Sequence, residues 1–290
     1  MNARATRSTR SERVGFGGLL ALTAGVVVIV LALLAYVFAH GVEVLGWEFL
    51  TQSPREGMLE GGIFPAIVGT LGLTLLTALV AVPLGVASAV YLVEYAREGW
   101  WVRLIRLSIR NLSGVPSVVF GLFGVGIFVH GLDLGLSMLA SGLTLGLLTL
   151  PTVITASEES LRTVPKAWRD GALALGATRW EAVWTNVLPA AFPGIVTGVI
   201  LGLARAAGET APILFTGVAF FLPHLPKGLV EPFMALPYHL YILSTQHEDL
   251  ARARPVAFGT ATVLIAVVAL LNGLAALLRA RARAAHAGRG

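Results

Sequence analysis

The sequence predicts an all-α membrane protein, built as a bundle of six transmembrane helices. Of its 290 residues, 56% are hydrophobic and 13% are charged, whereas a soluble domain carries about 25% charged residues. Six apolar runs are long enough to cross a bilayer, which takes about 20 residues. Arginine is concentrated in alternate segments between these runs, as in other proteins that cross a membrane several times.

The six apolar runs follow one another along the chain, separated by charged segments. The predicted spans are Val14–Ala39, Ile63–Val93, Ile109–Val129, Leu134–Ala156, Ala190–Leu222 and Val256–Leu278. The first run is too long for a removed signal peptide and has no small-residue cleavage site, so we expect it to remain as a span. We therefore divide the chain into an amino-terminal tail (1–13), a transmembrane domain (14–279) and a carboxyl-terminal tail (280–290).

The distribution of positive charge predicts the orientation. Most arginines and lysines lie before the first span, between the second and third, between the fourth and fifth, and after the sixth. By the positive-inside rule, both termini are then cytoplasmic in a multi-pass protein of the cytoplasmic (inner) membrane. The net charge of +5 follows from this topology, so membrane lipid is an expected partner and nucleic acid is not.

Arg205 and Glu209 are the charged residues within the fifth run. A charge in the bilayer costs about 2.5–3.5 kcal/mol on translocon scales, so such residues usually line a pathway or face a partner. The two are four residues apart, which places them on one helix face where they can pair. Two interpretations stay open: a structural ion pair between helices, or an element of a substrate pathway.

Glycine spacing predicts close packing in the same run. Gly194, Gly198 and Gly202 recur every four residues, a spacing that lets two helices approach closely. Proline residues such as Pro151 and Pro193 lie within apolar runs, where they can kink a helix. These features argue against a simple membrane anchor.

The segment 157–189 is predicted to be a cytoplasmic loop between the fourth and fifth spans. Pro165 suits the first turn of a new helix, and Gly176 can turn the chain between two short helices. Apolar residues between Trp168 and Leu175 follow helical spacing. Such a helix can lie on lipid, pack beneath its own bundle, or dock into a groove on a soluble partner.

This loop resembles that of the permease subunits of ABC importers, whose pattern is Glu-Ala-Ala, three residues, Gly, nine residues, Ile, one residue and Leu-Pro. The residues that stand at these pattern positions are Asp170, Gly171, Ala172, Gly176, Leu188 and Pro189. The departures are Asp170 for Glu, Gly171 for Ala and Asn186 for Ile. The resemblance implies the type I importer fold, in which the short helix after Pro165 is the coupling helix that sits in a cleft of the ATPase subunit.

Three further stretches are similar to the phosphate-specific permeases, and the last two look more like the PstA-type subunit. They are 113–123 (SGVPSVVFGLF), 150–165 (LPTVITASEESLRTVP) and 204–217 (ARAAGETAPILFTG). The resemblance implies import of inorganic phosphate, with a second permease, two ATPase subunits and an extracytoplasmic phosphate-binding protein as partners. ATP and Mg²⁺ are then bound by the ATPase, and this chain is a transport subunit with no cofactor and no bond chemistry of its own.

The physics of anion transport agrees with this implication. Phosphate crosses as an anion, so a low-dielectric passage needs a transient cation. Arg205, predicted near the middle of the fifth span, offers a planar fork suited to phosphate oxygens, and Glu209 would neutralise it when no substrate is present. Arg162, at the cytoplasmic end of the fourth span, is a second pathway candidate or a positive-inside anchor.

Other classes of function lack their motifs. There is no cysteine, no G-x-x-x-x-G-K-[ST] and no H-E-x-x-H, which excludes thiolate chemistry and a P-loop. No metal site is predicted, because the histidines on the outer side (His130, His224, His239 and His247) lack the spacing of a helical metal pair and are expected in loops and interfaces. Within the resemblance, sulfate or molybdate is the alternative substrate. In a different class, an ion-gradient-driven carrier would use Arg205 and Glu209 as a proton relay, but the internal repeats common in such carriers are missing.

Overall fold

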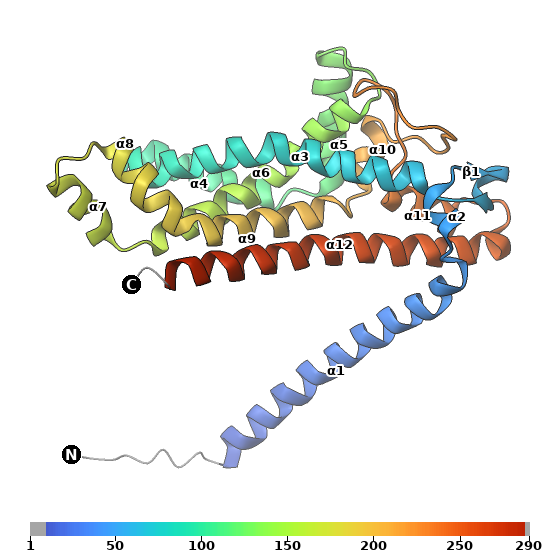
Figure 1. Cartoon of the computed structure of the whole chain (residues 1–290), viewed down its shortest axis with the longest axis horizontal. Coiled ribbons are helices and arrows are strands. Elements are labelled where there is room, and N and C mark those ends of the chain that lie inside the picture. The colour runs from blue at the N-terminus through green and yellow to red at the C-terminus, as the bar shows by residue number, and fades with distance from the viewer. Residues whose placement is uncertain (1–9, 288–290) are drawn as a thin grey trace.

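The computed structural model describes residues 10–287, and its regular structure is almost entirely helical. Long helices run side by side along the molecule, and short helices lie at both ends (Figure 1). The helices are α1 (Arg10–Gly41), α2 (Trp47–Thr51), α3 (Phe64–Val90), α4 (Trp100–Ser113), α5 (Ser117–Gly124), α6 (Met138–Thr163), α7 (Lys166–Ala174), α8 (Arg179–Ala182), α9 (Leu188–Ala206), α10 (Ala211–Thr216), α11 (Leu236–Thr245) and α12 (Leu250–Ala287).

Short 3-10 and π-helical segments extend several of these helices, and one small sheet is present. The 3-10 segments are η1 (Val42–Val44) and η2 (Glu56–Met58), and the π-helical segments are η3 (Tyr91–Tyr95), η4 (Val125–Gly131) and η5 (Val183–Val187). Strands β1 (Pro54–Arg55) and β2 (Glu60–Gly61) pair antiparallel. We call the end of the bundle that carries α7 and α8 the α7 end, and the opposite end, with α2, β1 and α11, the β1 end (Figure 1).

Five helical stretches in the described part of the chain are long and apolar enough to cross a membrane, and a bent pair makes a sixth if its two parts count as one span. The five are Val14–Val44, Phe64–Tyr95, Met138–Thr163, Arg179–Ala206 and Leu250–Arg281. They correspond to the first, second, fourth, fifth and sixth predicted spans. The tails predicted for 1–13 and 280–290 lie partly outside the described residues. The helical membrane bundle is therefore confirmed, with five clear spans, a sixth if the bent pair counts as one, and two corrections to the predicted bounds.

The third predicted span, Ile109–Val129, is wrong as a single helix. The chain forms Trp100–Ser113 and Ser117–Gly131 instead, and these two parts are bent by 103°. The break precedes α5, where Pro116 has no N–H for a continuing helix and disfavours a helical conformation at Val115. We call this break the α4–α5 break.

The fifth predicted span, Ala190–Leu222, is wrong in its bounds. The helical stretch begins at Arg179 and ends at Ala206, and α10 follows as a separate short helix. Arg205 therefore lies in the last turn of α9 rather than mid-span, and Glu209 lies beyond the helix end. Hydropathy alone could not show this break, because the residues after the helix are also mostly apolar.

Helix α6 lies at the centre of the bundle and packs against both α3 and α9. Its buried residues Val153 and Leu161 belong to one apolar cluster with residues of those two helices. Gly194 and Gly198 lie so close to Ser160 and Ala156 of α6 that an added Cβ would collide with them. The close approach predicted from glycine spacing is thus confirmed, and it matters because packing rather than hydrophobicity holds helices together in lipid.

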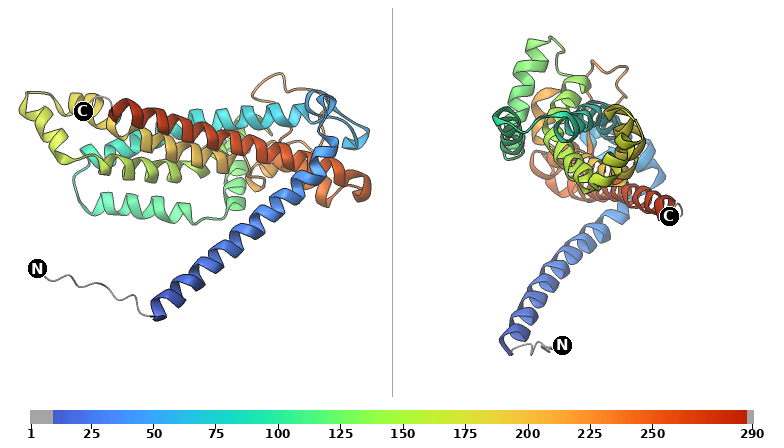
Figure 2. Two further views of the ribbon diagram at one scale, coloured as in Figure 1. Left: turned by 60° about the horizontal axis from the view of Figure 1, so that its bottom comes forward. Right: turned by 90° about the vertical axis from the view of Figure 1, so that its left-hand side faces the viewer.

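Helix α1 diverges from the rest of the bundle. Figure 2 shows it meeting the other helices near its carboxyl-terminal end alone, where Gly41 packs against Phe258 and Thr262 of α12. The most apolar stretch of the span Val14–Val44 has no residue buried within the chain. This helix therefore offers a long apolar surface to lipid or to another membrane subunit.

The β1 end is closed by α11, which packs on α3 and α12. The backbone N–H of Leu236 donates to the hydroxyl of Thr70 at 2.8 Å. His239 on α11 is fully buried, so its predicted place in a loop or interface is wrong. Burial disfavours the imidazolium form and lowers the pKa of His239 to about 4.

Candidate functional site

Arg205 and Glu209 form the predicted ion pair, but it is a loose one. Nε of Arg205 lies 3.4 Å from Oε1 of Glu209, which is longer than a typical charge-assisted hydrogen bond of about 2.7–2.9 Å. The Arg205 side chain is 66% exposed, whereas that of Glu209 is 16% exposed. The guanidinium carries five N–H donors, and most of them face outward without a partner in the described chain. The pair thus presents a cation at the end of α9.

Arg205 lies beside the α4–α5 break. A small cavity of about 20 Å³ separates it from Ser113 and Ser117 at the break, and residues of α6 complete the lining. The sequence could not indicate this neighbourhood, because it predicted an unbroken third span. Among the described residues, no group of three or more His, Asp or Glu is placed to hold a metal ion.

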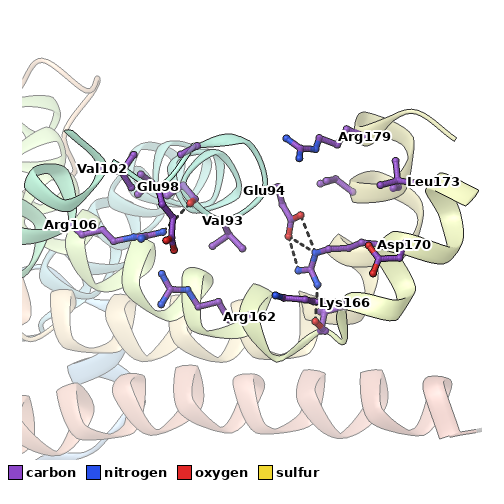
Figure 3. Close-up of a pocket in the computed structure, with 16 residues that line it drawn as sticks. Val93, Glu94, Glu98, Val102, Arg106, Arg162, Lys166, Asp170, Leu173 and Arg179 are labelled. Atoms are coloured by element: carbon purple, nitrogen blue, oxygen red, sulfur yellow. Dashed lines mark hydrogen bonds and ion pairs between the residues drawn. The ribbon is translucent and has the colours of Figure 1, made fainter. Parts of the chain in front are cut away.

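A second polar region lies at the α7 end, in a cavity of about 540 Å³ between the end of α3, the start of α4 and the α7–α8 segment. We call it the terminal pocket, and Figure 3 shows the side chains that line it. Its charged lining residues are Glu94, Glu98, Arg106, Arg162, Lys166, Arg169, Asp170 and Arg179. Because five of these are cations and three are anions, the pocket carries a positive excess.

Arg162, the second pathway candidate, points into the terminal pocket but has a partner. Its Nη2 donates to Oε2 of Glu158 at 2.8 Å, and Nε of Arg106 lies 3.4 Å from the same oxygen. Arg106 also donates to the carbonyl of Leu92 at 3.0 Å. This cluster joins α4, α6 and η3, so Arg162 has a structural contact as well as a half-exposed face toward the pocket.

The ion pair with the most hydrogen bonds at the α7 end joins Arg169 to Glu94. Nε and Nη2 of Arg169 donate to the Glu94 carboxylate at 2.6–3.0 Å, and the same guanidinium donates to the carbonyls of Val164 at 2.7 Å and Leu161 at 2.9 Å. The side chains are 19% and 8% exposed. We call this arrangement the Glu94–Arg169 brace. Its bidentate geometry is the strong form of an arginine–carboxylate contact, and it fixes α7 to the ends of α3 and α6.

The short helix predicted after Pro165 is confirmed as α7. Gly176 follows it with φ +89°, a left-handed conformation that glycine adopts without steric cost, and Thr178 then caps α8. The apolar side chains of Trp168 and Leu175 are exposed. The predicted apolar face of this segment is therefore not used inside the chain.

The two halves of the importer-like pattern have different environments. Asp170, Gly171 and Ala172 lie on α7, with Asp170 exposed at the terminal pocket. Leu188 and Pro189 begin α9, and Leu188 packs against the cluster formed by α3, α6 and α9. An added Cβ at Gly171 would meet nothing within 4 Å, so internal packing does not require glycine there. The first half of the pattern is exposed, and the second half belongs to the bundle.

The sequence pattern does not single out Glu94, which follows the second predicted span by one residue. An acid at a span end, on the side where arginines gather, is the signal that could have drawn attention to it. Its partner lies 75 residues away in a segment that holds several arginines. The tertiary structure alone identifies Arg169 among them.

A bundle of five or six membrane-crossing helices, with an exposed short helix at one end and a charged pair at the end of a span, defines a transport subunit embedded in a membrane. The chain belongs to the family described as the binding-protein-dependent transport system inner membrane component, which matches residues 81–284. The predicted recognition as a permease of this family is thus confirmed.

Curated relatives match over most of the chain. It is 37% identical to the "Phosphate transport system permease protein PstA 1" of Mycobacterium tuberculosis (strain CDC 1551 / Oshkosh), over 81% of this chain and 79% of that protein. It is 32% identical to the "Probable ABC transporter permease protein YqgI" of Bacillus subtilis (strain 168), over 88% of this chain and 90% of that protein.

Solved structures of ABC transporters share the fold. A bacterial ABC transporter involved in the import of the acidic polysaccharide alginate aligns with a TM-score of 0.65 at 13% identity, covering 94% of this chain and 96% of that one. The inward-facing MetNI methionine ABC transporter aligns with a TM-score of 0.58 at 15% identity, covering 76% and 94%. The predicted importer fold is therefore confirmed.

Proposed function

We propose that this chain is the transmembrane subunit of an ATP-driven importer that carries inorganic phosphate across the cytoplasmic membrane. The observation that carries the proposal is the outward-facing, loosely paired guanidinium of Arg205 at the end of α9. The resemblance to relatives named as phosphate permeases supplies the identity of the anion. Arginine is suited to this task, because its planar fork matches the oxygens of phosphate.

Glu209 gives this site a way to release its anion. With no substrate present, the carboxylate neutralises Arg205 across 3.4 Å. An arriving phosphate competes for the guanidinium, and its departure lets the carboxylate return. A contact this long stabilises the empty state enough to offset the charge, yet it leaves most of the arginine donors available.

We assign the α7 end to the cytoplasm, with both termini on that side, as the positive-inside rule predicts. The exposed apolar residues of the α7–α8 segment, including Trp168, Leu175 and Trp180, suit insertion into a cleft of an ATPase subunit. Two copies of that ATPase bind ATP and Mg²⁺. An extracytoplasmic phosphate-binding protein then docks at the β1 end.

A second permease is the remaining partner of this proposed complex. The span Val14–Val44 packs against nothing in its own chain over most of its length, and Arg205 faces outward from the bundle. A heterodimer would cover both features and place the phosphate path between the two permeases. The bend of α4 against α5 lies on the same route, because it borders Arg205.

Energy would reach the bundle through the Glu94–Arg169 brace. Closure of the ATPase dimer on ATP moves α7, and the brace connects that helix to η3 at the end of α3 and to the last turn of α6. Because α6 contacts both α3 and α9, a displacement of its end alters the packing around Arg205. Hydrolysis of ATP then resets the bundle.

The test is uptake of radiolabelled phosphate by vesicles that contain the co-expressed complex. We expect phosphate uptake to require ATP on the cytoplasmic face of the complex. Sulfate and molybdate should not inhibit it. Uptake of sulfate or molybdate in place of phosphate would leave the importer standing and overturn the choice of anion. Uptake that follows an ion gradient without ATP would overturn the importer itself.

A further inference from the structure

Thr149 on α6 has a buried hydroxyl that the fold itself does not use. The residue is 2% exposed, and its Oγ1 has no hydrogen-bond partner among residues 10–287. Two other threonines of α6 are satisfied within the helix, since Thr144 donates to the carbonyl of Ala140 at 2.7 Å and Thr155 donates to that of Pro151 at 2.8 Å. Leaving a buried hydroxyl unpaired is costly, so each case requires an explanation.

The surroundings of Thr149 explain why its hydroxyl has no partner in the fold. It lines the 20 Å³ cavity beside the α4–α5 break, together with Ser113, Ser117, Thr152 and Arg205. Four hydroxyl-bearing side chains and the exposed side chain of Arg205 thus border one cavity beside the break. Glycine at position 202 makes room there, because a Cβ on it would lie 3.3 Å from Cγ2 of Thr149.

We propose that this cavity is a binding site for a tetrahedral oxyanion, in which the Thr149 hydroxyl donates a hydrogen bond to one oxygen and the Arg205 guanidinium holds the charge. The site rests on the proposed function and makes it specific, because it names which residues besides Arg205 contact phosphate in the membrane. Hydroxyl donors suit an anion that must also leave, since they stabilise it without adding a second fixed charge.

The size of the cavity decides how the anion sits. A cavity needs about 10–15 Å³ of probe-occupied volume to hold one water molecule, so 20 Å³ accommodates one oxygen atom. The remaining oxygens lie outside it, against the exposed face of Arg205. Ser117, the first residue of α5, also lines the cavity, and the first N–H groups of a helix are suited to anions because they have no partner within the helix.

Ser113 has a different role from Thr149. Its Oγ already donates to the carbonyl of Ile109 at 3.1 Å, so it offers lone pairs to the cavity rather than its proton. A protonated phosphate carries a P–OH that can donate to such an acceptor. The site therefore combines donors for the charged oxygens with an acceptor for the protonated one.

The experiment compares three variants in reconstituted vesicles of the complete complex: Thr149→Val, Thr149→Ser and Thr144→Val. Valine keeps the shape of threonine and removes the hydroxyl. Thr144 is the matched control, because it is equally buried on the same helix but bonded to its own backbone. The measurements are KM and maximal rate of phosphate uptake, basal ATP hydrolysis, and recovery of the assembled complex.

We expect Thr149→Val to lower the ratio of maximal rate to KM for phosphate at least about ten-fold, because a hydrogen bond to a charged group is lost. Thr149→Ser should retain most of the uptake, Thr144→Val should resemble the wild type, and basal ATP hydrolysis should not change. Phosphate uptake by Thr149→Val at the wild-type level would overturn the proposed oxyanion site. So would equal losses of uptake and assembly in both Thr149 variants, because Thr149 would then be a packing residue.

The wild-type complex separates this inference from the proposed function. If it transports sulfate instead of phosphate, the proposed substrate fails, and the same three variants measured with sulfate still decide the oxyanion site. If it transports no oxyanion at all, both proposals fall.

Discussion

The two ion pairs to which we assign roles in the proposed function differ in almost every physical respect. The Glu94–Arg169 brace is bidentate, has distances of 2.6–3.0 Å and is largely buried. The Arg205–Glu209 pair makes one contact at 3.4 Å, and its arginine is 66% exposed. One pair also joins residues 75 positions apart, whereas the other joins neighbours in sequence.

This contrast agrees with the roles that we propose for the two pairs. Transmitting force between α7 and the bundle would require several bonds in a fixed geometry, because a loose contact would move without displacing its partner. Exchanging a carboxylate for a passing anion would require a weak pair. Each pair has one arginine and one glutamate, so charge does not distinguish them. The number and the length of their contacts do.

The largest expected effect is at the loose pair. Replacing Arg205 with glutamine should abolish phosphate uptake, at least about 100-fold, because the transient cation in the low-dielectric path is removed. The fold of this chain should not change, since the side chain is mostly exposed within it, and we expect the complex to assemble. Uptake assays with copurification of the ATPase check both points. Arg252→Gln, an equally simple change at an exposed arginine near the β1 end, is the control, and uptake retained by Arg205→Gln would make the pair structural.

Breaking the brace should uncouple rather than block the transporter. Arg169→Ala leaves the Glu94 carboxylate buried and unpaired, which costs about 3–5 kcal/mol for a fully buried pair and less here because Arg169 is 19% exposed. We expect uptake to fall about ten-fold while ATP hydrolysis continues, so that more ATP is consumed per phosphate transported. Parallel measurement of the two rates checks this.

Arg169→Lys sharpens the same comparison. It keeps the charge and loses the planar fork, so we expect intermediate coupling. Arg162→Ala is the matched control at the same end, where a half-exposed pair one helical turn apart contributes about 0.3–0.5 kcal/mol. Equal uncoupling by Arg162→Ala and Arg169→Ala would contradict a special role of the brace.

Lowering the pH should lower the local stability of the β1 end, where His239 lies, and should affect the α7 end less, so the α7 end serves as the internal reference. The pKa of His239 is about 4 in the folded chain and about 6.5 when unfolded. The neutral form is favoured by folding, so its contribution is fully present above pH 6.5 and is lost as the pH falls toward 4, by about 1.4 kcal/mol per unit. Hydrogen exchange, corrected for the intrinsic effect of pH, should show that α11 loses more protection than α7 when the pH falls from 7 to 5. His239→Leu should remove the difference, and unchanged exchange in the wild type would refute the assignment.

The smallest effect concerns the counter-ion of the loose pair. Glu209→Gln leaves Arg205 without its competing carboxylate, so phosphate should be held more tightly and released more slowly. We expect KM and maximal rate of uptake both to fall by a few-fold. Steady-state uptake over a range of phosphate concentrations measures both, and a rise in KM would mean that Glu209 helps to bind the anion instead of competing with it.

The sequence by itself determined the class of the fold, five of the spans, the position of α7 and the close approach of α9 to α6. These features depend on local properties: hydropathy over about 20 residues, a proline before a helix, glycines four residues apart. Arg205 and Glu209 were found for the same reason, because a charge within an apolar run is visible in one dimension.

Only the tertiary structure decided where the chain bends and which charges meet. The α4–α5 break and the end of α9 at Ala206 lie within runs whose hydropathy does not change, so hydropathy does not mark them. Glu94 and Arg169 are 75 residues apart, and Thr149 resembles the other threonines of α6 until its neighbours are in place. Pairing between distant residues depends on how α3, α6 and α9 pack, and packing is a property of three dimensions.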